Sequence, residues 1–234
     1  MNSQASIIAP ARRVLDSAIA TNDALGHDNL GSLSYSHGFL PRQQPIHQFP
    51  SSHHAWDQIA AEIPYLFRMF AVRRAVADLP VMSALPTDLP DEYVLRASSL
   101  FSILAHVYWY SDPEPPADGI PPQIQLPWEQ ITKRLDRPAP HLSFIDLNSH
   151  NWLFIDPKAS QPFASENLRL AVPMIGNEDE RRFQTVPVEM LYQFSPLMDV
   201  LLRAQEAVLK DDSAELESAL ITISAALKFQ TFNT

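Results

Sequence analysis

The sequence predicts an all-α protein with at most a short strand or two. Apolar residues recur at helical spacing through most of the chain, whereas strand-like alternation is seldom sustained. Twenty-one prolines against five glycines indicate helices that are ended or kinked by proline, with few glycine-rich loops. A length of 234 residues, 46% of them hydrophobic, is sufficient for a substantial buried core.

The order of the expected helices follows from this spacing. They cover residues 1–25, 53–63, 64–78, 91–110, 127–135, 178–210 and 213–229. Pro64 separates the second helix from the third, and Pro187 and Pro196 are expected to kink the long helix that starts at Glu178. Residues 91–110 follow a proline and are apolar nearly all round, which predicts the central buried helix.

Prolines and polar residues define the segments between these helices. Residues 111–122 are proline-rich, which predicts a semi-rigid strap on the surface. Residues 141–156 suggest extended chain, but Asn148 and Ser149 interrupt the alternation. Residues 168–175 suggest a short strand.

Composition excludes several classes of protein. A formal charge of −10 and a pI near 5.1 argue against binding to nucleic acid. Without cysteine there is no disulfide, thiolate nucleophile or thiolate metal ligand. The chain has no apolar run long enough to span a membrane, and its N-terminal positive charges follow the apolar residues, which reverses the order of a secretory signal. These features predict a cytoplasmic globular protein.

The motifs of common enzyme classes are absent from the sequence. There is no His-Glu-x-x-His, no Gly-x-Ser-x-Gly, no phosphate-binding or dinucleotide-binding loop, and no histidine pair spaced to chelate a metal from one helix face. His106 on the central helix is more simply explained as a hydrogen-bonded core residue than as a ligand. His141 and His150 flank a polar segment, and a surface loop explains them more simply than a pocket does.

Four stretches of the chain carry a family resemblance. They are His37-Gly-Phe-Leu-Pro41, Trp56 with the run that ends at Leu79-Pro80, Arg96 to Tyr108, and Leu126-Pro-Trp128 through Asn151-Trp152. None is specific alone. Because all four occur in the same order and with matching spacing, the sequence resembles the indoleamine 2,3-dioxygenase family, a group of all-α haem enzymes.

The resemblance implies a domain organisation and a chemistry. In this family a small N-terminal helical domain covers a haem that is held by a larger helical domain. The corresponding divisions here are residues 1–125, a pocket-lining connector at 126–156, and the incomplete beginning of the large domain at 157–234. Haem b and O2 would cleave the indole 2,3 bond of L-tryptophan, or of a tryptophan-derived intermediate of secondary metabolism, to an N-formylkynurenine-type product.

The resemblance also implies site residues. Phe144, Leu147 and Asn148 fall at positions that line the indole pocket on the distal side of the haem. Phe183 matches a distal aromatic residue, and Pro187 falls where some relatives carry serine; a register shifted by two residues places Thr185 there instead. These last three are the candidate catalytic residues, and no residue is assigned as a metal ligand.

The family's haem-ligating histidine, and the arginine that pairs with the substrate carboxylate, lie further along than residue 234 in this resemblance. The chain is therefore expected to be a fragment, a shortened gene product, or a relative without haem chemistry that serves as a catalytically inactive binding or assembly module. An incomplete domain would expose apolar helix faces and self-associate. The residues expected to be exposed are Leu197, Val200 and Leu201, or the stripe from Leu216 to Leu227.

Overall fold

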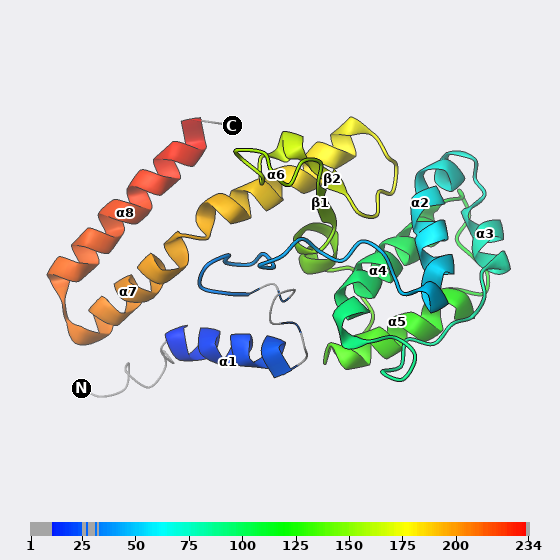
Figure 1. The fold of residues 1–234 in the computed structure, drawn as a ribbon, viewed down its shortest axis with the longest axis horizontal. Coiled ribbons are helices and arrows are strands. Elements are labelled where there is room, and N and C mark those ends of the chain that lie inside the picture. The colour runs from blue at the N-terminus through cyan, green and yellow to red at the C-terminus, as the bar shows by residue number, and fades with distance from the viewer. Residues whose placement is uncertain (1–10, 25–26, 28–30, 32, 233–234) are drawn as a thin grey trace. The chain divides into compact units, whose positions relative to one another are not determined.

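The protein is mostly helical, which confirms the predicted fold class. The structure is a computed structural model that describes residues 11–24, 27, 31 and 33–232. The described chain forms two compact units. Residues 43–188 are called the central unit, and the described parts of residues 1–42 together with 189–234 are called the terminal unit. The helices and strands of both are labelled in Figure 1.

The central unit consists of helices and one short hairpin. Its elements are α2 (His54–Arg68), α3 (Val72–Asp78), α4 (Val94–Tyr110), α5 (Pro122–Arg134), a π-helical turn (Ile145–Ser149), β1 (Trp152–Phe154), β2 (Leu168–Leu170) and most of α6 (Glu178–Phe194). The strands pair antiparallel, with Trp152 opposite Leu170. The predicted strand at 168–175 therefore exists but ends at Leu170.

Helix α4 is the centre of the core, as predicted for the segment that is apolar nearly all round. Thirteen of its 17 residues are buried, so α4 is covered on every side. The Trp56 side chain of α2 is fully buried, and its ring makes edge contacts with Phe101 of α4 at 4.8 Å and with Phe49 at 5.2 Å between centroids. Such aromatic contacts contribute beyond the area that they bury.

Three predicted helix boundaries are wrong, and each error concerns a proline. Pro64 lies inside α2, which continues to Arg68 because the apolar stripe through Ile63 and Leu66 remains buried. The break comes instead at Phe70, whose φ of 51° is left-handed. Helix α5 begins at Pro122 rather than Pro127, since proline is well suited to the first helical position.

The third error concerns the long helix expected over residues 178–210. Pro187 lies inside α6 without ending it, whereas α6 stops at Phe194 and α7 (Leu197–Lys210) begins after Pro196. Proline in the first turn of a helix has no intrahelical hydrogen bond to lose, so Pro196 starts a new helix rather than kinking the old one. The result is two helices in place of one.

The terminal unit contains α1 (Ala11–Ala24), α7 and α8 (Ser213–Phe232). Figure 1 shows α7 and α8 side by side. Arg12 of α1 bonds Glu206 of α7 at 2.6 Å, and this hydrogen bond raises the pKa of the guanidinium. Asp211 adopts a left-handed conformation at the end of α7, and Asp212 accepts a hydrogen bond from the Glu215 amide at the start of α8.

Apolar exposure in the terminal unit differs in part from the expectation. Leu197 and Val200 are buried, because α8 packs on that face of α7 through Ala219. Leu201 of α7, and Leu220 and Leu227 of α8, are exposed as expected.

Candidate functional site

The candidate site begins at the C-terminal end of α5. The Arg137 amide donates to the Thr132 carbonyl at 3.0 Å, and the Asp136 amide donates to Lys133 at 3.1 Å. Asp136 has a φ of 51°, so this end is a Schellman cap with aspartate in the position where glycine is usual. The cap turns the chain so that the Arg137 side chain can reach Asp146 at 2.8 Å.

Asp146 is the most heavily bonded carboxylate of this region. Its side chain is 1% exposed. It accepts hydrogen bonds from Ser98 Oγ at 2.5 Å, from Arg137 Nη1 at 2.8 Å and Nη2 at 3.2 Å, and from Ser143 N at 3.1 Å and Oγ at 2.6 Å. A buried charge is tolerated only when it is paired and hydrogen-bonded in this way. Ser98, Arg137, Ser143 and Asp146 are called the Asp146 cluster below.

Asp146 also lies within the π-helical turn, Ile145–Ser149. The His150 amide donates to the Ile145 carbonyl at 3.0 Å, a spacing of five residues. Turns of this kind insert an extra residue and are frequent at functional sites. Here the turn buries Asp146 and Asn148 but leaves Phe144 54% exposed. The turn lies where Asn148 and Ser149 interrupt the alternation, and the later part of residues 141–156 contains the extended strand β1.

Asparagine and glutamine side chains tie the turn to α6. Asn148 Nδ2 donates to the Gln184 carbonyl at 3.0 Å, and Asn151 Nδ2 donates to Gln184 Oε1 at 2.9 Å. Asn151 also exchanges two hydrogen bonds with the backbone of Val172, at 2.7 and 3.0 Å. The turn and α6 are thus joined through buried amides.

A second carboxylate fixes the start of α6. The Glu180 carboxylate accepts from the amides of Met174, Ile175 and Gly176 at 2.6, 2.9 and 2.7 Å. Gly176 has a φ of 74°, and a Cβ at this position would lie 2.8 Å from Pro64 Cβ, so only glycine fits. The loop before α6 is therefore held against α2.

The first turn of α6 carries an exposed ion-pair group. Hydrogen bonds from Arg181 and Arg182 lower the pKa of the Glu178 carboxyl to about 2. Acidic residues suit the first turn of a helix because they oppose its dipole. Any stabilisation from this group is present above pH 4.5, the ordinary value, and is lost as the pH falls toward 2.

The sequence-predicted residues fall into two sets. Asn148 bridges to α6, and Leu147 is half-buried against the core, whereas Phe144 projects into solvent. On α6, Phe183 is 75% exposed and Thr185 is fully buried. The Asn148–Gln184 bond places the turn beside the part of α6 that carries the candidate catalytic residues, including the half-buried Pro187.

Two buried hydroxyls stand out at this contact. Ser149 Oγ on the turn and Thr185 Oγ1 on α6 have no hydrogen-bond partner in the described structure. Buried hydroxyls normally find a partner, so these two side chains are exceptions among the buried polar groups of the site.

Sequence reasoning did not single out the residues that build the base of this site: Ser98, Arg137, Asp146 and Gln184. One signal was available, because Arg96, Ser98, Ser99 and Ser102 interrupt an otherwise apolar helix. Buried polar side chains in such a helix require partners elsewhere in the fold.

Two histidines of the central unit are engaged in hydrogen bonds within the protein. Both ring nitrogens of His53 are hydrogen-bonded, to Ser52 Oγ and to the Ser83 carbonyl at 2.9 Å each. His106 bonds the Ser102 carbonyl at 2.9 Å, in line with the predicted core role. Within the described residues, no three histidine, aspartate or glutamate side chains form a group that could hold a metal.

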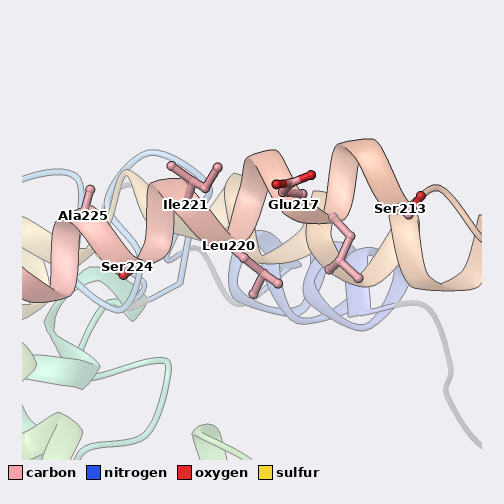
Figure 2. A pocket seen from close by; sticks show the side chains of 7 residues that line it. Ser213, Glu217, Leu220, Ile221, Ser224 and Ala225 are labelled. Atoms are coloured by element: carbon pink, nitrogen blue, oxygen red, sulfur yellow. The ribbon is translucent and has the colours of Figure 1, made fainter.

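A surface hollow lies elsewhere, on α8. Figure 2 shows that its labelled lining comes from this one helix, and the lining consists of Ser213, Leu216, Glu217, Leu220, Ile221, Ser224 and Ala225. It contains no histidine. The residues present therefore do not fit axial ligation of haem, and the hollow is an apolar helix face rather than an enclosed cofactor site.

The fold and the site together define a mostly helical protein in which the exposed Phe144 ring precedes a turn that is held by buried polar residues. A family model described as indoleamine 2,3-dioxygenase matches residues 32–231. The chain therefore belongs to the indoleamine 2,3-dioxygenase family, which confirms the resemblance. Members of this family are haem-dependent dioxygenases that act on a small molecule with O2.

Individual relatives are similar at about one quarter identity. Indoleamine 2,3-dioxygenase 1 of Rattus norvegicus is 25% identical over 79% of this chain and 44% of its own length. Indoleamine 2,3-dioxygenase 2 of Homo sapiens is 24% identical over 80% and 45%, and indoleamine 2,3-dioxygenase qulI of Penicillium citrinum is 24% identical over 81% and 42%. The chain thus spans about half the length of the curated relatives it matches.

Among the helices that the structure describes, none combines the length and the apolar character needed to cross a membrane.

Proposed function

We propose that this chain acts in a haem-dependent dioxygenase that cleaves the indole 2,3 bond of L-tryptophan, or of a tryptophan-derived metabolite, to an N-formylkynurenine-type product. The observation that carries the proposal is the wall at residues 144–148, which presents an exposed phenyl ring from a rigid buried base in a member of this family. The proposed compartment is the cytoplasm.

In this proposal the wall binds and orients the substrate. Phe144 and Leu147 supply apolar surface for the indole, and Asn148 holds the turn to α6 at the Gln184 carbonyl. Phe183 supplies a second aromatic face. Such surfaces exclude water from the bound indole, and an apolar lining with few polar groups is usual for small-molecule sites.

The roles on α6 depend on the register with the family. Pro187 is one candidate for the position at which some relatives carry serine, and Thr185 is the other. The unpartnered Thr185 hydroxyl supports the second register, because it has a hydrogen bond to offer at the contact between the turn and α6. The proposed domains are residues 1–125, the connector 126–156, and 157–234.

Haem, when bound, supplies the reaction with dioxygen. No residue of this chain is assigned as a haem ligand, so no step is routed through haem. The contribution of this chain is binding, orientation and exclusion of water by the residues named above.

The experiment that tests the proposal is expression with haem supplementation. A Soret band, haem in a pyridine extract, and an N-formylkynurenine-type product from L-tryptophan with reductant and O2 are the expected results. A colourless protein without extractable haem would reject the proposal for this chain alone.

A second candidate is a catalytically inactive member of the family that serves as a binding or assembly module. The observation in its favour is that His53, a buried histidine of the central unit, has both ring nitrogens bonded within the protein, at 2.9 Å each. This candidate predicts no Soret band but retained binding of L-tryptophan or indole by the haem-free chain, measured by NMR titration.

A further inference from the structure

We propose that Arg137, Asp146 and Ser98 are positioning residues that set the place and orientation of the substrate wall. The inference rests on the proposed function, because it assumes that Phe144 and Leu147 face the indole. It adds residues that touch no substrate themselves.

The ion pair between Arg137 and Asp146 joins the two ends of a short loop. Arg137 and Asp146 are nine residues apart and form a two-pronged ion pair at 2.8 and 3.2 Å. The chain between them contains Pro138 and Pro140 and neither an α-helix nor a strand. The bonds at its base therefore help to fix the conformation of this loop, together with the 3.4 Å hydrogen bond from Ser102 to the His141 carbonyl and the packing of Leu142 on the core.

Burial makes this base rigid. The side chain of Asp146 is 1% exposed and that of Arg137 is 16% exposed, and Ser98 comes from the buried helix α4. Replacing one member leaves its partner charged and out of water, which is strongly unfavourable. The loop thus has one favoured arrangement, with the carboxylate turned inward.

The inward carboxylate dictates which side chains point outward. Asp146 is buried, while the residues directly before it, Phe144 and Ile145, are 54% and 38% exposed. At the other end of the turn, Asn148 is fixed to the Gln184 carbonyl. Leu147 lies between these two anchors and packs in part against the core, so the positions of both proposed indole-facing residues depend on the neighbouring polar bonds.

A π-helical turn adds a reason for such anchoring. Its extra residue can be lost if the turn relaxes to an α-helix, and one residue of slippage rotates a side chain by about 100° around the helix axis. Two anchors only two residues apart prevent that rotation. Without the Asp146 anchor, Phe144 would no longer have a fixed direction.

The test compares Asp146→Asn, Arg137→Lys and Ser98→Ala with the full wild-type chain. The matched control is Asp112→Asn, whose carboxylate instead pairs with Arg73 at 3.1 Å. Hydrogen exchange of the amides of residues 143–150 reports the anchoring directly, and NMR titration with L-tryptophan reports its consequence for binding.

For Asp146→Asn we expect at least about tenfold faster exchange in residues 143–150, unchanged exchange in α2, and about tenfold or more weaker binding of L-tryptophan, because small misplacements of a site wall have large effects. Arg137→Lys keeps the positive charge beside Asp146, so its effects on exchange and on binding should be smaller than those of Asp146→Asn. Asp112→Asn should leave both unchanged.

The outcomes separate the two proposals. If the wild-type chain binds L-tryptophan and the variants bind it equally well, or if exchange in residues 143–150 stays as slow as in wild type, the positioning role is rejected and the proposed function stands. If the wild-type chain binds neither L-tryptophan nor haem, the proposed function itself fails. If Asp146→Asn no longer unfolds cooperatively, the same exchange and binding measurements on Ser98→Ala and Arg137→Lys test the positioning role.

Discussion

Helix α4 is apolar on nearly every side and α8 carries an apolar stripe from Leu216 to Leu227, yet the two helices differ in how far their apolar residues are covered. In α4, 13 of 17 residues are buried, and the Trp56 ring of α2 packs on its Phe101. In α8, Ala219 is buried, while Leu220 and Ile221 are 54% and 63% exposed. Apolar residues at helical spacing predict a helix and favour burial of the face that carries them. The comparison shows that the pattern alone does not supply the partner that buries it.

The largest loss of stability is expected when the core ring that packs on α4 is truncated. Trp56→Ala removes the fully buried indole that contacts Phe101 of α4, and it should lower the free energy of unfolding by about 3–5 kcal/mol. Urea unfolding followed by circular dichroism, with hydrogen exchange of α4 amides to report the central unit, measures the effect. A loss below about 1 kcal/mol would show that the core can collapse around the missing ring.

An exposed ring of the wall should behave in the opposite way. Phe144 is 54% exposed, so Phe144→Ala should change the free energy of unfolding by no more than about 0.5 kcal/mol. In a haem-loaded sample it should weaken indole binding by roughly 3 kcal/mol, because a buried aromatic wall contributes that much when a ligand packs on it. Isothermal titration measures the affinity.

The control for this variant is Phe70→Ala, which removes another exposed ring of the central unit. It should leave indole binding unchanged. Equal affinity of Phe144→Ala and wild type would remove Phe144 from the proposed wall.

The difference between local patterns and bonds to distant residues explains what could be predicted from sequence. The helical class, the buried α4 and the family follow from apolar spacing and four motifs, and all three are confirmed. The π-helical turn could not be predicted, because Asp146 bonds Ser98, which is 48 residues away, and no local pattern specifies such a partner. Pro64 and Pro127 were expected to begin helices but lie inside them, since packing outweighs one lost hydrogen bond.

Helix ends in the two units allow a smaller, paired test. Phe70 in the central unit and Asp211 in the terminal unit both have left-handed φ values, 51° and 56°, at the end of a helix. Aspartate tolerates this conformation better than phenylalanine does. Phe70→Gly should therefore raise the free energy of unfolding by about 0.5–1 kcal/mol, and Asp211→Gly by less than about 0.3 kcal/mol. Equal gains in thermal unfolding would show that backbone strain is not what distinguishes these ends.

The smallest change in stability is expected on the exposed face of α8. Ile221 is 63% exposed and lines the hollow in Figure 2, so Ile221→Lys should alter the free energy of unfolding by no more than about 0.5 kcal/mol. Contiguous exposed apolar surface favours association, and the added charge should lower any self-association seen by sedimentation velocity. Leu197→Lys is the matched control: Leu197 is 5% exposed beneath α8, so a buried lysine there should destabilise strongly. If Ile221→Lys were as destabilising as Leu197→Lys, this face of α8 would be buried in the folded protein, and α8 would resemble α4 after all.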